Sequence, residues 1–148
     1  NGLIPPSILN NNLSLAVMEK PVWPGCVSSN SPAALKFLRS TRTTHISWSS
    51  QARGYFLNPG QGTEVSQETR PDVCFNSYDN LERKARAKKL ALDRDVETHN
   101  IATAWVLNQS FPSIALIGPR TVDEIYSTLN STKVILTKEE CAWLNLEQ

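Results

Sequence analysis

The sequence lacks an excess of charge of either sign. Lysines and arginines number 15, and aspartates and glutamates number 14 among 148 residues, so the formal net charge at pH 7 is +1. A chain with neither a basic nor an acidic bias does not show the electrostatic pattern of a nucleic-acid-binding protein. We therefore expect no nucleic-acid partner.

Long apolar runs are missing as well. No stretch reaches the roughly 20 residues that a helix needs to span a bilayer. Hydrophobic residues nevertheless make up 40% of the chain, which is enough for a core of ordinary domain size. We therefore expect a soluble, globular chain without a membrane partner.

Cysteine is scarce, with three residues at positions 26, 74 and 141 and no C-x-x-C pair. An odd number of widely spaced cysteines argues against a disulfide framework and against a zinc site. Such usage fits a reducing compartment, and we expect a cytoplasmic location. The chain begins at Asn1 without a visible signal peptide, which suggests a processed or partial chain.

Several well-known motifs are also absent. The sequence has no G-x-S-x-G, no P-loop, no G-x-G-x-x-G and no H-E-x-x-H. It therefore contains no sequence motif for a common catalytic nucleophile, a nucleotide-binding loop or a metal site. His45 and His99 are isolated in sequence, and we interpret both as structural or surface residues. From the motifs alone we assign no catalytic residue and no metal ligand.

Turn-forming residues divide what remains into alternating strands and helices. Runs of apolar and β-branched residues predict strands at 7–11, 43–49 and 113–117, of which the first is expected to be buried and the third fully buried. Helical spacing predicts helices at 32–41, 80–95 and 96–108, a further helix from 122 and a short last helix from 138. Glycines and prolines from 54 onward exclude regular structure, and we interpret 54–78 as a binding loop or lid.

Caps and apolar stripes define these helices further. Ser31 with the following proline, Thr121 with Glu124, and Thr137 with Glu140 are typical helix starts. The apolar stripes of these helices, which we expect to face inward, are Ala34, Leu35 and Leu38; Leu81, Ala85 and Leu92; Ile101, Ala104 and Trp105; Val122, Ile125 and Leu129; and Cys141, Trp143 and Leu144. The basic run 83–89 is interpreted as the solvated face of its helix.

The order of strands and helices predicts an α/β fold with a parallel sheet and helical crossovers. Three βα units are too few to close a sheet. A closed (β/α)8 TIM barrel takes about 250 residues for eight units. We therefore interpret the chain as a partial barrel, with its last three βα units and a C-terminal helix. A small open doubly wound sheet is the alternative.

In such folds the ligand lies at the carboxyl ends of the strands. The first predicted strand ends among three asparagines at 10–12, which suit either an amide ligand or a turn. The second ends at Trp48, followed by small residues and Arg53, which suit either a planar ring and an anion or a core tryptophan followed by a serine turn. The third leads into Gly118 and Arg120 before a capped helix, where free N–H groups, the helix dipole and a guanidinium predict a phosphate site. A plain strand-to-helix connection with a solvated Arg120 is the alternative.

Taken in order, four segments resemble the C-terminal half of an aldo/keto reductase. They are NNNLSLA (10–16), HISWSSQARGYF (45–56), ALIGPRTVDEIYSTL (115–129) and LTKEECAWLNLE (136–147). The resemblance covers nearly the whole chain and implies a TIM-barrel oxidoreductase that uses NADP(H). Enzymes of this family reduce aldehydes or ketones by direct hydride transfer from the nicotinamide, so the implied partner is a small carbonyl substrate.

The resemblance also implies roles for residues near the first two strand ends. Asn12 stands where the family usually has a glutamine that holds the nicotinamide carboxamide. Trp48 stands where an aromatic ring, often tyrosine, stacks on the nicotinamide. Ser49, Gln51 and Arg53 occupy the loop that wraps the pyrophosphate.

Four further positions are implied at the third strand end. Gly118 and Arg120 fall in the stretch that contacts the 2′-phosphate, and Glu124 and Thr128 match positions near the adenine. The family commonly has a basic or amide residue at the position of Glu124 and asparagine at that of Thr128. A preference for NADPH over NADH therefore depends mainly on Arg120.

The family's catalytic aspartate, tyrosine, lysine and histidine lie on earlier strands, and this chain has no counterpart of that region. Residues 1–148 are therefore expected to be the C-terminal, cofactor-binding part of a reductase, inactive in isolation because no group protonates the carbonyl oxygen. Two alternatives stay open. One is a non-catalytic remnant that binds nucleotide or another protein, and the other is a different TIM barrel that binds a phosphorylated substrate.

Overall fold

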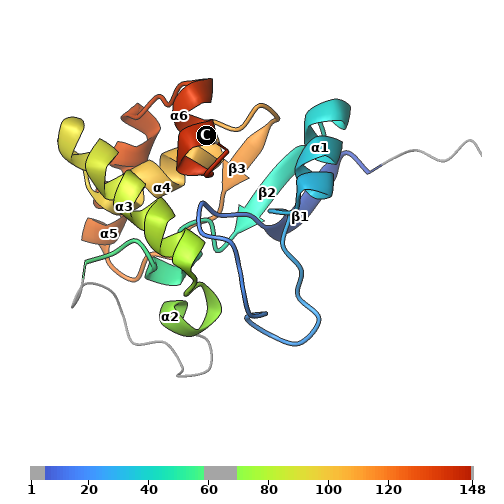
Figure 1. The fold of residues 1–148 in the computed structure, drawn as a ribbon, viewed down its shortest axis with the longest axis horizontal. Helices are drawn as coiled ribbons and strands as arrows, with labels where there is room; N and C mark the ends of the chain where they lie inside the picture. The colour runs from blue at the N-terminus through green and yellow to red at the C-terminus, as the bar shows by residue number, and fades with distance from the viewer. Residues whose placement is uncertain (1–5, 59–69, 148) are drawn as a thin grey trace, which may run out of the picture.

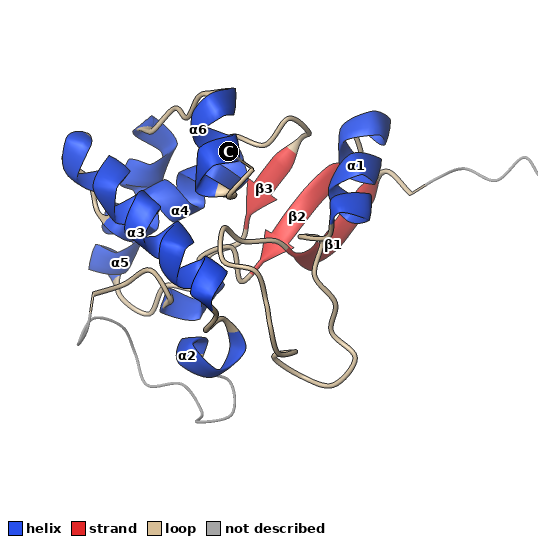
Figure 2. Cartoon of the chain, in the orientation of Figure 1, coloured by secondary structure: helices blue, strands red, loops and turns tan. Residues whose placement is uncertain are grey.

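A computed structural model describes residues 6–58 and 70–147 of the chain (Figures 1 and 2). The strands are β1 (Ile8–Asn12), β2 (Thr44–Trp48) and β3 (Ser113–Ala115). The helices are α1 (Pro32–Thr41), α2 (Pro71–Cys74), α3 (Tyr78–Asp93), α4 (Thr98–Leu107), α5 (Val122–Leu129) and α6 (Lys138–Leu144), with 3₁₀ turns η1 (Ala52–Gly54) and η3 (Asn130–Lys133).

The strands form one parallel sheet in the order β1-β2-β3. This confirms the expected α/β fold with helical crossovers. Each strand differs from its predicted bounds by one or two residues: β1 extends to Asn12, and β3 ends at Ala115 although Leu116 still donates to Ser47 O at 3.0 Å. Asn12 is therefore the last residue of a strand. Figure 1 shows α3 to α6 gathered beside β3, with α1 beside β1 and β2.

The two faces of the sheet differ in burial. His45 and Ser47 of β2 are fully buried, and their strand partners Leu9 and Ala115 pack against the core. On the other face Ile8 is 53% exposed and Ile114 is 48% exposed. A parallel sheet usually has both faces covered. The predictions that the first and third strands are buried are therefore wrong, because the described residues leave Ile8 and Ile114 on this face half-exposed.

The helix starts follow from local side-chain hydrogen bonds. Ser31 Oγ accepts from the amide of Ala34, and Thr121 Oγ1 accepts from that of Glu124, both at 3.2 Å. Thr137 and Glu140 form a reciprocal capping box at the start of α6. These three predicted caps are confirmed. Each one satisfies an amide that the first turn of a helix leaves without a partner.

Helix α3 buries a different face from the one predicted. Leu81 is 55% exposed and Leu92 is 74% exposed, whereas Ala87 and Ala91 are buried along with Arg83. Its small alanines allow close approach to α4, the helix with which it shares most of its contacts. The basic run is therefore not wholly solvated, since the Arg83 side chain points inward and donates to Asn80 Oδ1 at 3.1 Å.

Helix α5 also differs from expectation. The predicted inward residues are exposed, Val122 by 62%, Ile125 by 39% and Leu129 by 47%. Only Thr128 of this helix is buried. The amphipathic pattern is present, but no described element packs on its apolar side. Helix α4, by contrast, buries Ile101, Ala104 and Trp105 as predicted.

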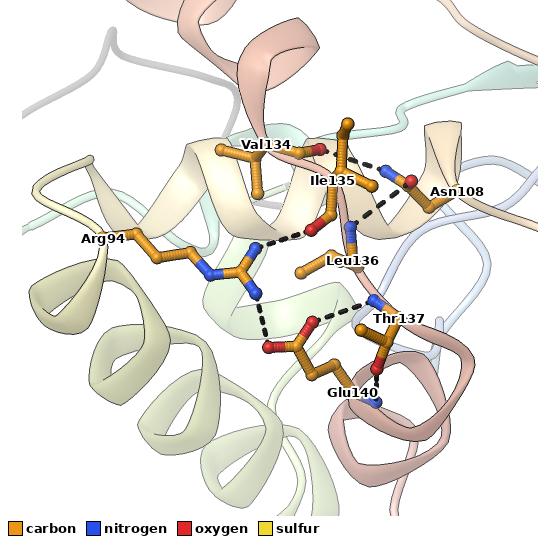
Figure 3. Close-up of polar contacts among 7 residues, drawn as sticks. All are labelled: Arg94, Asn108, Val134, Ile135, Leu136, Thr137 and Glu140. Carbon is orange, nitrogen blue, oxygen red and sulfur yellow. Dashed lines mark hydrogen bonds and ion pairs between the residues drawn. The ribbon is translucent and has the colours of Figure 1, made fainter.

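The segment before α6 is held by polar contacts from the ends of two helices (Figure 3). Arg94, after α3, donates to the carbonyl of Ile135 at 2.9 Å and forms an ion pair with Glu140. Asn108, after α4, donates to Val134 O and accepts from the amide of Leu136. These contacts fix the C-terminal segment on the helical layer. Leu144 of α6 is fully buried there.

The region predicted as a long irregular loop at 54–78 contains regular structure. Helix α2 begins at Pro71, and Tyr78 is the first residue of α3. The rest of the predicted lid, 59–69, lies outside the described residues. Among the helices of the described ranges, none is long and apolar enough to cross a membrane.

Acid is expected to destabilise the fold through His45. Its Nδ1 lies 2.8 Å from Ser47 Oγ and its Nε2 lies 3.0 Å from Ser29 Oγ, and burial lowers the pKa of the imidazole. The unfolded chain therefore binds this proton more tightly, so the contribution of His45 to stability is complete above pH ~6.5 and is lost below it. Urea midpoints at pH 7.5 and 5.5 measure the loss.

A matched variant separates His45 from the other titrating groups. Glutamine at this position is neutral at both pH values, so His45→Gln should lose less stability on acidification than the wild type. The remaining decrease comes from groups such as His99, whose pKa is also lowered by burial. An equal decrease in both proteins would show that His45 is not kept neutral by the fold.

Candidate functional site

A cleft of about 800 Å³ lies beyond the carboxyl ends of β2 and β3. Its volume is within the range of small-molecule sites. The loop after β2 forms one wall, and the segment from β3 into α5 forms another. Of the nine predicted cofactor-binding residues, seven line the cleft: Ser49, Gln51, Arg53, Gly118, Arg120, Glu124 and Thr128.

The loop after β2 has an unusual backbone. Ser49, Ala52 and Arg53 adopt left-handed conformations with φ of 48°, 48° and 55°, and Gly54 follows at 90°. Each such non-glycine residue costs about 1–2 kcal/mol. The loop is held by a bond from Ala52 N to Ser49 O and by Ser50 Oγ, which donates to Leu116 O at 2.6 Å. Strain of this kind concentrates at binding sites, which supports a functional role for the loop.

Gln51 connects the two walls of the cleft. Its Nε2 donates to Thr103 Oγ1 of α4 and to Thr128 Oγ1 of α5, both at 3.3 Å. The side-chain amide therefore already has two protein acceptors. These two hydrogen bonds fix the loop after β2 relative to α4 and α5, and so fix the distance between the two walls of the cleft.

The N-terminus of α5 differs from the predicted phosphate site. The amide of Arg120 donates to Glu124 Oε2 at 2.7 Å, and the amide of Glu124 donates to Thr121 Oγ1. These two N–H groups are thus not free: the cap hydroxyl of Thr121 holds one, and the carboxylate of Glu124, favoured there by the helix dipole, holds the other. An anion that binds here has to do so beside a negative charge.

The charges on the described cleft walls are mixed. Arg53 and Arg120 supply two positive charges, and Glu97, Asp123 and Glu124 supply three negative ones. The cleft therefore has no uniform potential for an anion. Any selectivity for phosphate depends on where each arginine lies relative to the carboxylates, as close pairs dominate over more distant charges in water.

Asn12 and Trp48 do not line this cleft. Asn12 is fully buried at the end of β1, where its Nδ2 donates to Trp48 O at 3.2 Å. Its Oδ1 is buried and has no hydrogen-bond partner within the described ranges. A buried acceptor without a partner costs about 1–3 kcal/mol. Trp48 is half-buried and stacks with Trp23, their ring centroids 4.6 Å apart and their planes at 31°.

His99 is a cleft residue that sequence reasoning missed. It lies in the first turn of α4, where its Nε2 lies 3.1 Å from Ser127 Oγ and 3.2 Å from Asn100 Nδ2. Burial lowers the pKa of this imidazole, while the nearby Glu97 carboxylate raises it. A helix that precedes a parallel strand begins near the carboxyl edge of the sheet. The position of His99 at the start of such a helix could therefore have predicted its place beside the cleft.

Comparisons with known proteins agree with the predicted resemblance. The family model of the aldo/keto reductases matches residues 4–145. An uncharacterized oxidoreductase of Bacillus subtilis (strain 168), YrpG, is 29% identical over 104 residues, which are 68% of this chain and 30% of the relative.

A solved structure shares the fold. It is that of the thermostable aldo-keto reductase Tm1743 in complex with the inhibitor epalrestat, with a TM-score of 0.61 and 16% identity. The match covers 95% of this chain and 39% of that one. The chain thus spans between three and four tenths of the length of these two proteins.

Proposed function

The chain belongs to the aldo/keto reductase family, and from this premise we propose that it forms the cofactor-binding part of an NADP-dependent reductase of aldehydes or ketones. The observation that supports this most is the convergence of two strand ends on one cleft, with seven of the nine implied residues around it. The topology brings those residues together, since β2 and β3 are parallel neighbours whose carboxyl ends lie side by side.

In this proposal residues 1–148 are the C-terminal part of a (β/α)8 barrel. The order β1-β2-β3 with all strands parallel is that of three successive barrel units. A closed barrel also accounts for the apolar side chains of the open face, Ile8 and Ile114, because further strands would enclose them. The proton donor then belongs to another part of the reductase, and this chain alone binds cofactor without turnover.

The residues present fit a nicotinamide cofactor in several respects. The unpartnered Oδ1 of Asn12 is an acceptor suited to a carboxamide N–H, and the adjacent Trp48 offers an aromatic surface. Ser49 and Arg53 suit a pyrophosphate, and Arg120 suits a 2′-phosphate. When bound, the cofactor supplies the hydride for carbonyl reduction.

The remaining implied residues have more limited roles in this proposal. Gly118 leaves room for close approach, because no atom lies within 4 Å of the position that a Cβ would take. Gln51, from the loop implied for the pyrophosphate, donates to Thr128, which is implied near the adenine, and so links these two parts of the cleft. The function of these residues is to bind and orient the cofactor.

Calorimetric titration of the chain with NADPH tests the proposal. We expect saturable 1:1 binding that NADP⁺ displaces and that glucose 6-phosphate does not. Displacement by the sugar phosphate alone would instead indicate a TIM barrel that binds a phosphorylated substrate. No heat with NADPH at millimolar concentration would contradict the proposed cofactor site.

Neutralising Glu124 is expected to strengthen NADPH binding. Glutamine keeps the oxygen that accepts from the amide of Arg120 but removes the negative charge beside the predicted phosphate position. For an exposed pair of charges, the gain is about threefold at low salt and decreases as salt is added. Asp79→Asn, an exposed change on α3, is the control. Equal affinity of Glu124→Gln and wild type at low salt would place the phosphate elsewhere.

A further inference from the structure

The two ends of the proposed cofactor site differ in accessibility. The end formed by the loop after β2 and by α5 is an open cleft. The end formed by Asn12 and Trp48 is covered, because Asn12 has no exposed surface and the ring of Trp48 is stacked by that of Trp23. A nicotinamide needs both an uncovered ring face and access to the amide.

Trp23 comes from the segment between β1 and α1, which starts at the carboxyl edge of the sheet. The segment is fixed at both ends: Glu19 and Lys20 donate to Cys74 O at 2.8 and 3.2 Å, and Ser29 donates to Asn12 O at 2.8 Å. These hydrogen bonds keep the segment that carries Trp23 near the proposed site, even when the conformation of residues 21–27 changes.

The tip itself, residues 21–27, has few buried contacts. Val22 is its only buried side chain, Val27 is 62% exposed and Trp23 is 49% exposed. A turn closed by Cys26 N and Trp23 O contains Gly25 at φ 81°. A segment with few buried contacts between fixed ends opens at low cost. Val22 and Cys26 anchor the tip on the core, whereas the half-exposed side chain of Trp23 is held by its stack on Trp48.

We propose that Trp23 occupies the place of the nicotinamide ring against Trp48 and gates that end of the site. The inference depends on the proposed cofactor-binding function. The Trp23 ring covers an apolar face of Trp48. It supplies no hydrogen-bond donor to Asn12 Oδ1, which has no partner in the described parts of the chain. A nicotinamide offers both a planar ring and a carboxamide donor. It therefore displaces Trp23, whereas the adenosine half of the cofactor enters without this exchange.

Two ligands separate the ends of the site. NADPH has the nicotinamide, and 2′-phosphoadenosine 5′-diphosphoribose is the same molecule without it. Calorimetry on the 148-residue chain is expected to show that Trp23→Ala binds NADPH about tenfold more tightly than wild type, as an aromatic pair no longer competes. The affinity of Trp23→Ala for 2′-phosphoadenosine 5′-diphosphoribose should stay within about twofold of the wild-type value. This result also shows that the variant is folded.

Two further variants sharpen the test. Trp23→Phe keeps an aromatic ring and should lie between wild type and Trp23→Ala in NADPH affinity. Val27→Ala changes an exposed residue of the same tip and should leave both affinities unchanged.

Three results would overturn the gate. Unchanged NADPH affinity in Trp23→Ala would show that the stack does not compete with nicotinamide. Weaker NADPH binding would show that Trp23 supports Trp48 from the opposite ring face. In both cases the cofactor-binding function stands, because wild type still binds both ligands. If wild type binds neither ligand, the proposed function fails and the gate fails with it.

Discussion

Alanine at position 120 is expected to weaken NADPH binding about 20-fold and to change NADH binding by less than about twofold. Only NADPH has the 2′-phosphate, and a guanidinium is the side chain best suited to hold it. Arg120 lines the cleft, directly before the N-terminus of α5. The difference between the binding free energies of NADPH and NADH therefore depends largely on this side chain.

Calorimetry with both cofactors at one ionic strength measures this difference. Lys36→Ala removes an exposed cation from α1 and is the matched control for net charge. It should leave the ratio of the two affinities unchanged. Equal losses of NADPH and NADH affinity in Arg120→Ala would refute the phosphate role and would indicate that the arginine acts on the cleft as a whole.

Truncating Trp105 is expected to lower the free energy of unfolding by about 3–5 kcal/mol. This residue of α4 is 1% exposed, and its indole Nε1 donates to Cys141 O at 3.1 Å. Alanine leaves a cavity where α4 meets the C-terminal helix, and it also leaves a carbonyl without that donor. Because α4 provides His99 and Thr103 near the cleft, the same change should loosen the site.

Urea denaturation followed by circular dichroism measures this loss. Tyr78→Ala removes an aromatic side chain that is 87% exposed and should change stability by less than about 0.5 kcal/mol. A loss below about 1 kcal/mol in Trp105→Ala would mean that α4 is not the centre of the core.

The sequence predicted the order of the elements well because turn residues and caps act locally. Ser31, Thr121 and Thr137 each cap the helix that they were expected to cap. These hydrogen bonds span three residues and do not depend on distant parts of the chain. The parallel sheet followed from the alternation of strands and helices.

Burial was predicted less well because it depends on neighbours. The apolar spacing of Val122, Ile125 and Leu129 correctly marks one side of α5, but no described element covers it. In α3, the alanines Ala87 and Ala91 are buried and the leucines Leu81 and Leu92 are exposed, although spacing alone favoured the leucines. Periodicity indicates which side is apolar and not whether a partner is present.

In the candidate site, likewise, the features set by topology were predicted, and the contacts between individual side chains were not. The loops that line the cleft were predicted from two strand ends, which topology brings together. The carboxylate of Glu124 on the amide of Arg120 and the stack of Trp23 on Trp48 were not predicted. Both depend on side-chain conformations in three dimensions, to which spacing in sequence gives no guide.

The most direct test of a cofactor site in this cleft is the change in backbone amide NMR shifts on addition of NADPH to the 16.5 kDa chain. The largest changes are predicted for the amides of residues 49–54, 118 and 120–124, with Trp23 and Trp48 also affected. Changes confined to other surfaces, or none at saturating NADPH, would contradict the account.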